Sequence, residues 1–375
     1  MTIGVLSLAV LLRIERVGVG LSSLVFAGRR SLDAAGLDAP PELTIAEAGQ
    51  GYDGAVFYFM ALDPFSTEAV AGLREPGYRH QRILFPLVAG LLNQASSVSV
   101  LVTLLAVNLL AAAVMTWLAS GLALDWGRSP LLGVLAGLSP PMIVGTLYDT
   151  SEPMALTLMV GGIAATIRGK PVLVALLLSA AVLTRETTVV APLGILAWQL
   201  VSVLTGHKAL RNVALAALVP VAVFALWQAV LAGIWGGPPA IQGGAGRLGL
   251  PVLDVVQSLV SSTPDPRIQA PSPVREVWWV GRILLAVTVT IAGAVILKDW
   301  FGRHRPVADS PIPFVYGVAA LPPLLAGPWL WPQQYARSAG EWLIVSALVL
   351  LAHRGLLSRV GWYTLMLLSA VVIMA

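Results

Sequence analysis

The stretch Gly51-Tyr-Asp-Gly-Ala-Val-Phe-Tyr-Phe-Met-Ala-Leu-Asp-Pro-Phe65 places one acid, Asp53, ahead of an apolar run and a second acid, Asp63, directly behind it. The run Ala55 to Leu62 covers about 12 Å as a helix, which is too little for a hydrocarbon core of about 30 Å. Asp53 suits the N-cap of such a helix, and Asp63-Pro64 suits its end. We therefore expect a short helix in the outer membrane interface, with a carboxylate at its head.

The composition of the whole chain is that of an integral membrane protein. Of its 375 residues, 57% are hydrophobic and 11% are charged, against about 45 to 50% and about 25% in soluble proteins. Mean hydropathy is +0.83. Apolar runs extend from end to end and leave no room for a soluble domain. We expect a single all-α transmembrane domain over residues 1–375.

Two features of the composition exclude classes of function. The chain has no cysteine, which excludes disulfides, zinc thiolate sites and thiol catalysis. Its net charge of +4 is accounted for by the basic residues that orient a protein in the membrane, so no nucleic-acid partner is expected.

Apolar runs predict about eleven transmembrane helices. The runs lie at 3–27, 96–122, 131–147, 152–167, 171–184, 187–205, 212–234, 277–298, 311–330, 341–353 and 358–375.

The distribution of charge predicts the orientation of these helices. If the N-terminus is cytoplasmic, the lysines Lys170, Lys208 and Lys298 fall in or beside inner loops, while most acids lie on the outer side. This pattern follows the positive-inside rule. We expect a multi-pass protein of the cell (inner) membrane whose active site faces the periplasm or exterior. Two long outer loops, 28–82 and 235–276, are the expected carriers of function.

Arginines follow the first acid within the same loop. Arg79 and Arg82 lie three positions apart, on one helical face if the segment is helical. Transfer of a sugar from a lipid phosphate requires a carboxylate to accept a hydroxyl proton and cations to stabilise the departing phosphate. Arginine suits phosphate because its planar fork donates two parallel hydrogen bonds.

A second charged site lies between two apolar runs with almost no linker. Arg185 and Glu186 are adjacent there. Burying charges at such a position costs free energy unless they form ion pairs or act in a functional site. They point apart if helical, so they do not pair with each other. The chain comes back to the outer side at Glu152, which can pair with Arg185. Further along the chain, Arg337 lies among outer aromatic residues.

Several of these motifs together resemble a known family. They are Tyr52-Asp-Gly54, Phe57-Tyr-Phe59, Tyr78-Arg-His-Gln-Arg82 before Phe85-Pro86, Ser151-Glu152 and Leu183-Thr-Arg-Glu-Thr187. The likeness, over roughly residues 45–195, is to the GT-C superfamily of polytopic glycosyltransferases, in particular bacterial relatives of the GPI-anchor mannosyltransferases. The chain departs from these enzymes in two respects. It has Tyr52 where they carry a Trp, and it has no second acid adjacent to Asp53.

The resemblance implies two short juxtamembrane helices in the first outer loop, a polyprenyl-phosphate sugar as donor, and an acidic base. Carried over by position, Asp53 is the expected base. The candidate substrate contacts are Tyr52, Arg79, His80, Arg82, Glu152, Arg185, Glu186 and Arg337. The expected partners are the polyprenyl-phosphate donor and membrane lipids. The acceptor and the sugar stay open, mannose-type being favoured.

Three classes of function remain open. An inverting glycosyltransferase uses Asp53 as its single base carboxylate, by analogy with single-displacement glycosidases. A multi-pass transporter or lipid flippase has ionisable residues at mid-membrane on interrupted helices. In a noncatalytic assembly subunit, Asp53 is only a helix cap and the arginines anchor the chain at lipid headgroups. No cofactor is required by these residues, although Asp53, Asp63 and Glu152 are candidate ligands for a divalent metal.

Overall fold

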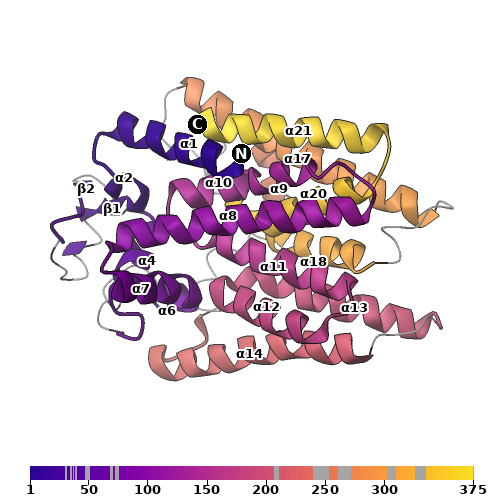
Figure 1. Cartoon of the computed structure of the whole chain (residues 1–375), viewed down its shortest axis with the longest axis horizontal. Helices are drawn as coiled ribbons and strands as arrows, with labels where there is room; N and C mark the ends of the chain where they lie inside the picture. The colour runs from indigo at the N-terminus through magenta and orange to yellow at the C-terminus, as the bar shows by residue number, and fades with distance from the viewer. Residues whose placement is uncertain are drawn as a thin grey trace.

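The computed structural model describes residues 1–29, 32–33, 36, 38, 40–46, 51–67, 71, 76–206, 211–239, 253–260, 272–301, 310–325 and 335–374. Within these ranges the chain is almost entirely helical, and its one sheet is a parallel pair of two-residue strands (Figure 1). The all-α class predicted from the sequence is confirmed.

The elements fall into three stretches of the chain. The first contains α1 (Thr2–Val17), α2 (Ser22–Val25), β1 (Ala27–Gly28), β2 (Ile45–Ala46), α4 (Asp53–Leu62), α6 (Pro76–His80), α7 (Leu84–Ser96) and α8 (Val100–Asp125). The second contains α9 (Leu132–Gly137), α10 (Pro140–Leu147), α11 (Glu152–Ile167), α12 (Pro171–Thr184), the 3-10 helix η1 (Glu186–Val189), α13 (Val190–Leu204) and α14 (Arg211–Trp235). The third contains α16 (Leu253–Val260), α17 (Ser272–Phe301), α18 (Ile312–Leu325), α19 (Tyr335–Ser338), α20 (Gly340–Ala352) and α21 (Leu356–Met374).

Long apolar helices support the membrane assignment. Five helical segments in the described ranges are long and apolar enough to cross a bilayer: Val100–Asp125, Glu186–Leu204, Asn212–Trp235, Arg275–Phe301 and Leu356–Ile373. Helices α11 and α12 occupy their predicted ranges but have 16 and 14 residues, fewer than the ~20 of a typical span. The full set of eleven spans stays a prediction.

The first predicted run, 3–27, is not one helix. Helix α1 stops at Val17 because Gly18 adopts φ 78° and its N–H bonds back to Ile14 O, which is a left-handed helix stop. The chain then re-enters a short separate helix, α2. Helix α7 is likewise distinct from α8, since Ser97 has φ 56° and the Ser99 side chain caps α8 by accepting from Leu101 N.

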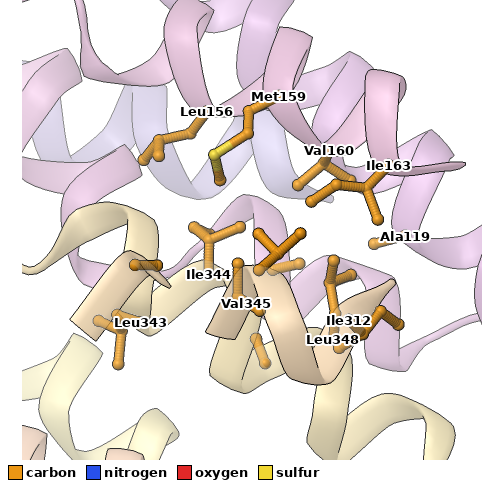
Figure 2. Close-up of a cluster of buried hydrophobic side chains, with 14 of the residues drawn as sticks. Ala119, Leu156, Met159, Val160, Ile163, Ile312, Leu343, Ile344, Val345 and Leu348 are labelled. Carbon is orange, nitrogen blue, oxygen red and sulfur yellow. The ribbon is translucent and has the colours of Figure 1, made fainter. Parts of the chain in front are cut away.

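The core is centred on α11. Figure 2 shows α11 side chains, among them Leu156, Met159 and Ile163, facing Ile344 of α20, with Ala119 of α8 and Ile312 of α18 in the same cluster. Helix α12 approaches α11 closely. A Cβ on Gly162 would lie 2.3 Å from Leu178 Cδ2, so a larger residue there would force the Leu178 side chain to move. This burial accounts for the apolar character of α11 around its whole circumference.

The bundle has two chemically different ends. Helix α8 has 26 residues and is therefore about 39 Å long. Near its first residue lie α4, α6, α7 and the two strands, which form the end we call the α4 end (left in Figure 1). Near its last residue, Arg168 bonds Asp125 at 2.7 Å and Arg354 Nη2 donates to Gly127 O at 2.6 Å.

The two predicted outer loops are described in part. The first contains α4 and α6, as the expectation of two short helices there requires. The second, 235–276, contributes α16, while 240–252 and 261–271 lie outside the described residues, as do Lys208 and residues 302–309.

Candidate functional site

Helix α4 begins one residue earlier than the sequence indicated. Asp53 is its first helical residue and Tyr52 is the N-cap, with no side-chain cap hydrogen bond. The prediction that Asp53 is the N-cap is therefore wrong. Gly54 explains how closely this helix start is packed, because a Cβ there would lie 2.6 Å from Tyr148 O and 2.9 Å from Val25 O.

Helix α4 is also more buried than an interfacial helix. Residues Gly54 to Ala61 are all buried, whereas a helix lying on a membrane surface exposes one polar face. Its neighbours include α2, α7 and α8. Neighbouring helices therefore cover α4 on all sides, and its position in the outer membrane interface stays a prediction.

Three arginines from different parts of the chain surround Asp53. Arg79 pairs with Oδ1, Arg337 Nη2 lies 2.8 Å from Oδ2, and Arg82 Nη1 lies 3.6 Å from Oδ2. Arg79 is on α6, which ends at His80, and Arg82 follows in the turn before α7. The two arginines converge as predicted, although no single helix contains both.

Arg82 also holds Glu186. Its Nε lies 2.8 Å from Glu186 Oε2 and its Nη2 lies 2.6 Å from Oε1, so both edges of the fork are used. The Tyr78 hydroxyl donates to the same Oε1 at 2.9 Å. Glu186 is the first residue of η1, directly after α12 ends.

The Arg185 side chain contacts a different set of residues from Arg82. It pairs with Glu152 Oε1, its Nε lies 2.9 Å from Glu341 Oε1, and its Nη2 donates to Arg337 O at 3.0 Å. The predicted pairing of Arg185 with Glu152 is therefore present. Glu341 was not predicted as a site residue. It carries the same signal as Glu152, an acid at the first turn of an apolar helix.

Arg337 links the two carboxylates predicted to act in the site. Its Nε lies 2.6 Å from Glu152 Oε1 and its Nη2 2.8 Å from Asp53 Oδ2. Its guanidinium also covers the Tyr52 ring, 4.9 Å from the centroid. We call the set Asp53, Arg79, Arg82, Glu152, Arg185, Glu186, Arg337 and Glu341 the ion-pair cluster.

The ion-pair cluster has an inner and an outer edge. The side chains of Glu152 and Arg185 are 1% and 6% exposed, whereas those of Asp53 and Arg79 are 17% and 16% exposed. Solvent or a ligand therefore reaches the cluster first at the Asp53–Arg79 pair.

Arginine charges set the ionisation of Asp53. Burial alone would raise its pKa, but the Arg79, Arg337 and Arg82 cations together hold the pKa well below its usual value. Burial raises the pKa of the neighbouring Tyr52 hydroxyl to about 12. At neutral pH Asp53 is therefore a carboxylate and Tyr52 a neutral phenol.

Two predicted residues lie apart from the cluster. His80 is buried against tryptophans, and Trp235 Nε1 donates to its Nδ1 at 3.3 Å. Asp63 is exposed at the far end of α4, about 15 Å from Asp53 along the helix axis. The three candidate metal ligands therefore do not meet, and the described part of the chain holds no group of three His, Cys, Asp or Glu suited to a metal.

Comparison with known proteins finds no family model, no curated protein and no solved structure that matches the chain. The fold and the cluster define its class: an all-α protein with helices long and apolar enough to cross a membrane and a buried array of arginines and carboxylates.

Proposed function

We propose that the chain is a glycosyltransferase of the GT-C type. It moves a sugar, mannose-type in the favoured case, from a polyprenyl-phosphate carrier to a lipid, glycan or protein acceptor, with inversion. The observation that carries the proposal is the Asp53 carboxylate, held by Arg79, Arg82 and Arg337 at the most exposed edge of the ion-pair cluster.

The cluster offers the two functions that this transfer needs. Asp53 accepts the proton of the acceptor hydroxyl while the hydroxyl oxygen bonds to the anomeric carbon of the sugar. The bond from that carbon to the phosphate oxygen breaks, and its electron pair stays on the phosphate. Arginine N–H groups stabilise this charge as it develops. The products are a glycoside, polyprenyl phosphate and a protonated Asp53.

The arginine partners also explain when the base becomes active. Their charges keep Asp53 a weak proton acceptor in the ligand-free state, because they hold its pKa low. A donor phosphate that engages Arg79 and Arg337 draws these cations away from Asp53. The base therefore gains strength once the donor is bound.

The position of the cluster favours an enzyme over a transporter. Transporters place ionisable residues near the middle of the bilayer, on interrupted helices in matching halves. Here Asp53, Arg79 and Arg82 belong to the α4 end of the bundle, and the other members of the cluster join them through ion pairs. In the proposed topology, this end faces the periplasm or exterior, the N-terminus is cytoplasmic and about eleven helices cross the bilayer.

Sugar transfer in proteoliposomes tests the proposal. The assay offers labelled polyprenyl-phosphate sugars and a lipid-extract acceptor to wild type, Asp53→Asn and a control, Asp125→Asn. Loss of a general base lowers transfer by about 10²- to 10⁴-fold. The control makes the same chemical change at the opposite end and keeps wild-type activity. Full transfer by Asp53→Asn overturns the assignment, and sugar that crosses the bilayer without forming a new bond indicates a transporter.

A further inference from the structure

A second set of polar side chains adjoins the ion-pair cluster and shares Glu152 with it. Asn108 comes from α8, Asp149 and Ser151 from the connection between α10 and α11, and Glu152 from the start of α11. All four are completely buried. We call these residues the polar group.

Each member of the polar group has one oxygen that lacks a hydrogen bond. Among the described residues, no partner reaches Asn108 Oδ1, Asp149 Oδ2, Ser151 Oγ or Glu152 Oε2. Folded proteins leave few buried polar atoms without a partner, and each one costs free energy. Four such atoms on neighbouring residues are the kind of arrangement that a bound ligand completes.

Glu152 shows how the polar group is joined to the arginines. Its Oε1 accepts from Arg185 and from Arg337 Nε, the latter at 2.6 Å, while its Oε2 has no donor among the described residues. One oxygen of this carboxylate therefore contacts two arginines of the ion-pair cluster, while the other makes no hydrogen bond to them.

The connection that carries Asp149 is held in an unusual conformation. Asp149 has φ 43°, a region that non-glycine residues rarely occupy. Its neighbour Tyr148 packs on Tyr52 with ring centroids 4.8 Å apart, and Tyr148 O is the atom that excludes a side chain at position 54. The Tyr148–Tyr52 ring contact and the close approach of Tyr148 O to α4 therefore fix the course of the backbone that carries Asp149.

The chemistry of the four oxygens selects the ligand. The Asn108 and Glu152 oxygens accept hydrogen bonds, while the Ser151 hydroxyl can also donate. Burial raises the pKa of Asp149 well above its usual value, which favours the protonated form that donates as well. A prenyl chain offers neither donors nor acceptors. The hydroxyls of a sugar supply several donors, and the anomeric phosphate places them beside the arginines. The described residues include no group of three His, Cys, Asp or Glu that suits a metal ion, so hydroxyls fit better than a metal.

We propose that Asn108, Asp149, Ser151 and Glu152 form the subsite that binds the hydroxyls of the donor sugar and selects which sugar is transferred. This inference rests on the proposed function, since it assigns the sugar-binding part of the same site.

Paired binding measurements test the subsite. Protein in lipid nanodiscs is titrated with polyprenyl phosphate and with a panel of polyprenyl-phosphate hexoses and pentoses of the same chain length. The preferred sugar should bind wild type about tenfold tighter than bare polyprenyl phosphate, since its hydroxyls add hydrogen bonds to charged groups. Ser151→Ala, Asn108→Leu and Asp149→Asn should each reduce this ratio towards one while leaving the affinity for bare polyprenyl phosphate unchanged.

A matched control separates sugar binding from folding. Ser346 is as buried as Ser151, but its hydroxyl donates to Trp342 O at 2.8 Å, so Ser346→Ala should keep the wild-type ratio. Ser151→Ala removes a single atom and remains informative if Asp149→Asn fails to fold. Equal loss of affinity for both lipids would show a role at the phosphate instead. An unchanged ratio in the folded variants would mean that the oxygens hold only ordered water.

Failure of this inference differs from failure of the proposed function. If wild type binds every sugar lipid no better than polyprenyl phosphate, the subsite is wrong, whereas transfer that depends on Asp53 still stands. If the subsite variants alter sugar affinity but Asp53→Asn retains transfer, the base assignment fails by itself.

Discussion

The Arg82 guanidinium and the Glu186 carboxylate meet edge to edge, with Nε 2.8 Å from Oε2 and Nη2 2.6 Å from Oε1. This is the two-point geometry in which arginine binds a planar or tetrahedral oxyanion. Glu186 thus occupies the arginine edge that a phosphate would use, and it sets the direction in which that edge faces.

Arg82→Lys should impair transfer although it keeps the positive charge. Lysine is a point donor and cannot make the paired contact with Glu186 that orients this cation beside Asp53. The loss of one charge-assisted hydrogen bond corresponds to about 1.5–3 kcal/mol, so kcat/KM for the donor should fall roughly 10- to 100-fold. Steady-state transfer assays measure this. Arg168→Lys, at an exposed pair, is the control, and equal rates for both variants would remove Arg82 from the site.

Asp53→Asn should bind polyprenyl phosphate more tightly while losing transfer. In the ion-pair cluster, four arginines face four carboxylates, Asp53, Glu152, Glu186 and Glu341, so an incoming phosphate competes with an internal acid. Removal of that acid should raise affinity by about tenfold, or about 1.4 kcal/mol. Titration in nanodiscs measures the change, with Asp125→Asn as control. Weaker binding by Asp53→Asn would show that the carboxylate helps to hold the phosphate.

The stability contributed by Asp53 should be lost only in acid. Its folded-state pKa is held well below the usual value, so the unfolded chain takes up the proton first as the pH falls. The difference in melting temperature between wild type and Asp53→Asn should therefore stay constant from pH 8 to about pH 5 and change below about pH 4, near the ordinary aspartate value. Thermal unfolding in detergent measures this. A difference that changes near neutral pH would contradict the low pKa.

Arg185→Met should be strongly destabilising. It leaves Glu152 and Glu341, which are 1% and 4% exposed, without this cation. Breaking a buried pair from one side costs about 3–5 kcal/mol. Arg168→Met breaks a pair whose side chains are 41% and 51% exposed, and such pairs contribute about 0–1 kcal/mol. Denaturant titration compares the two, and equal effects would argue against a buried cluster.

The sequence predicted helices well where local signals were strong. Apolar runs located α11 and α12 at their observed residues because Pro153 and Pro171 lie in the first turn of each. It failed at the first run, where Gly18 stops α1. It also did not show that α4 is covered by neighbouring helices, because an apolar run alone does not reveal what packs against it.

The sequence identified most residues of the candidate site, but it did not show which of them contact one another. Charges at the ends of apolar runs identified Asp53, Glu152 and Arg185, since such charges are costly unless used. Their partners could not be read from spacing: Asp53 and Arg337 are 284 positions apart. His80 was misplaced because a sequence does not show that tryptophans surround it, and Glu341 was missed because nothing local links it to Arg185.

The break between α12 and η1 gives the cluster a mechanical property. Arg185 reaches Glu152 and Glu341, while the next residue, Glu186, reaches Arg82. A single peptide unit therefore joins the half of the cluster anchored on α11 and α20 to the half anchored beside α6. A ligand that displaces Arg82 would therefore act on Glu152 and Glu341 through this peptide unit, in addition to the connection that Arg337 makes between Asp53 and Glu152.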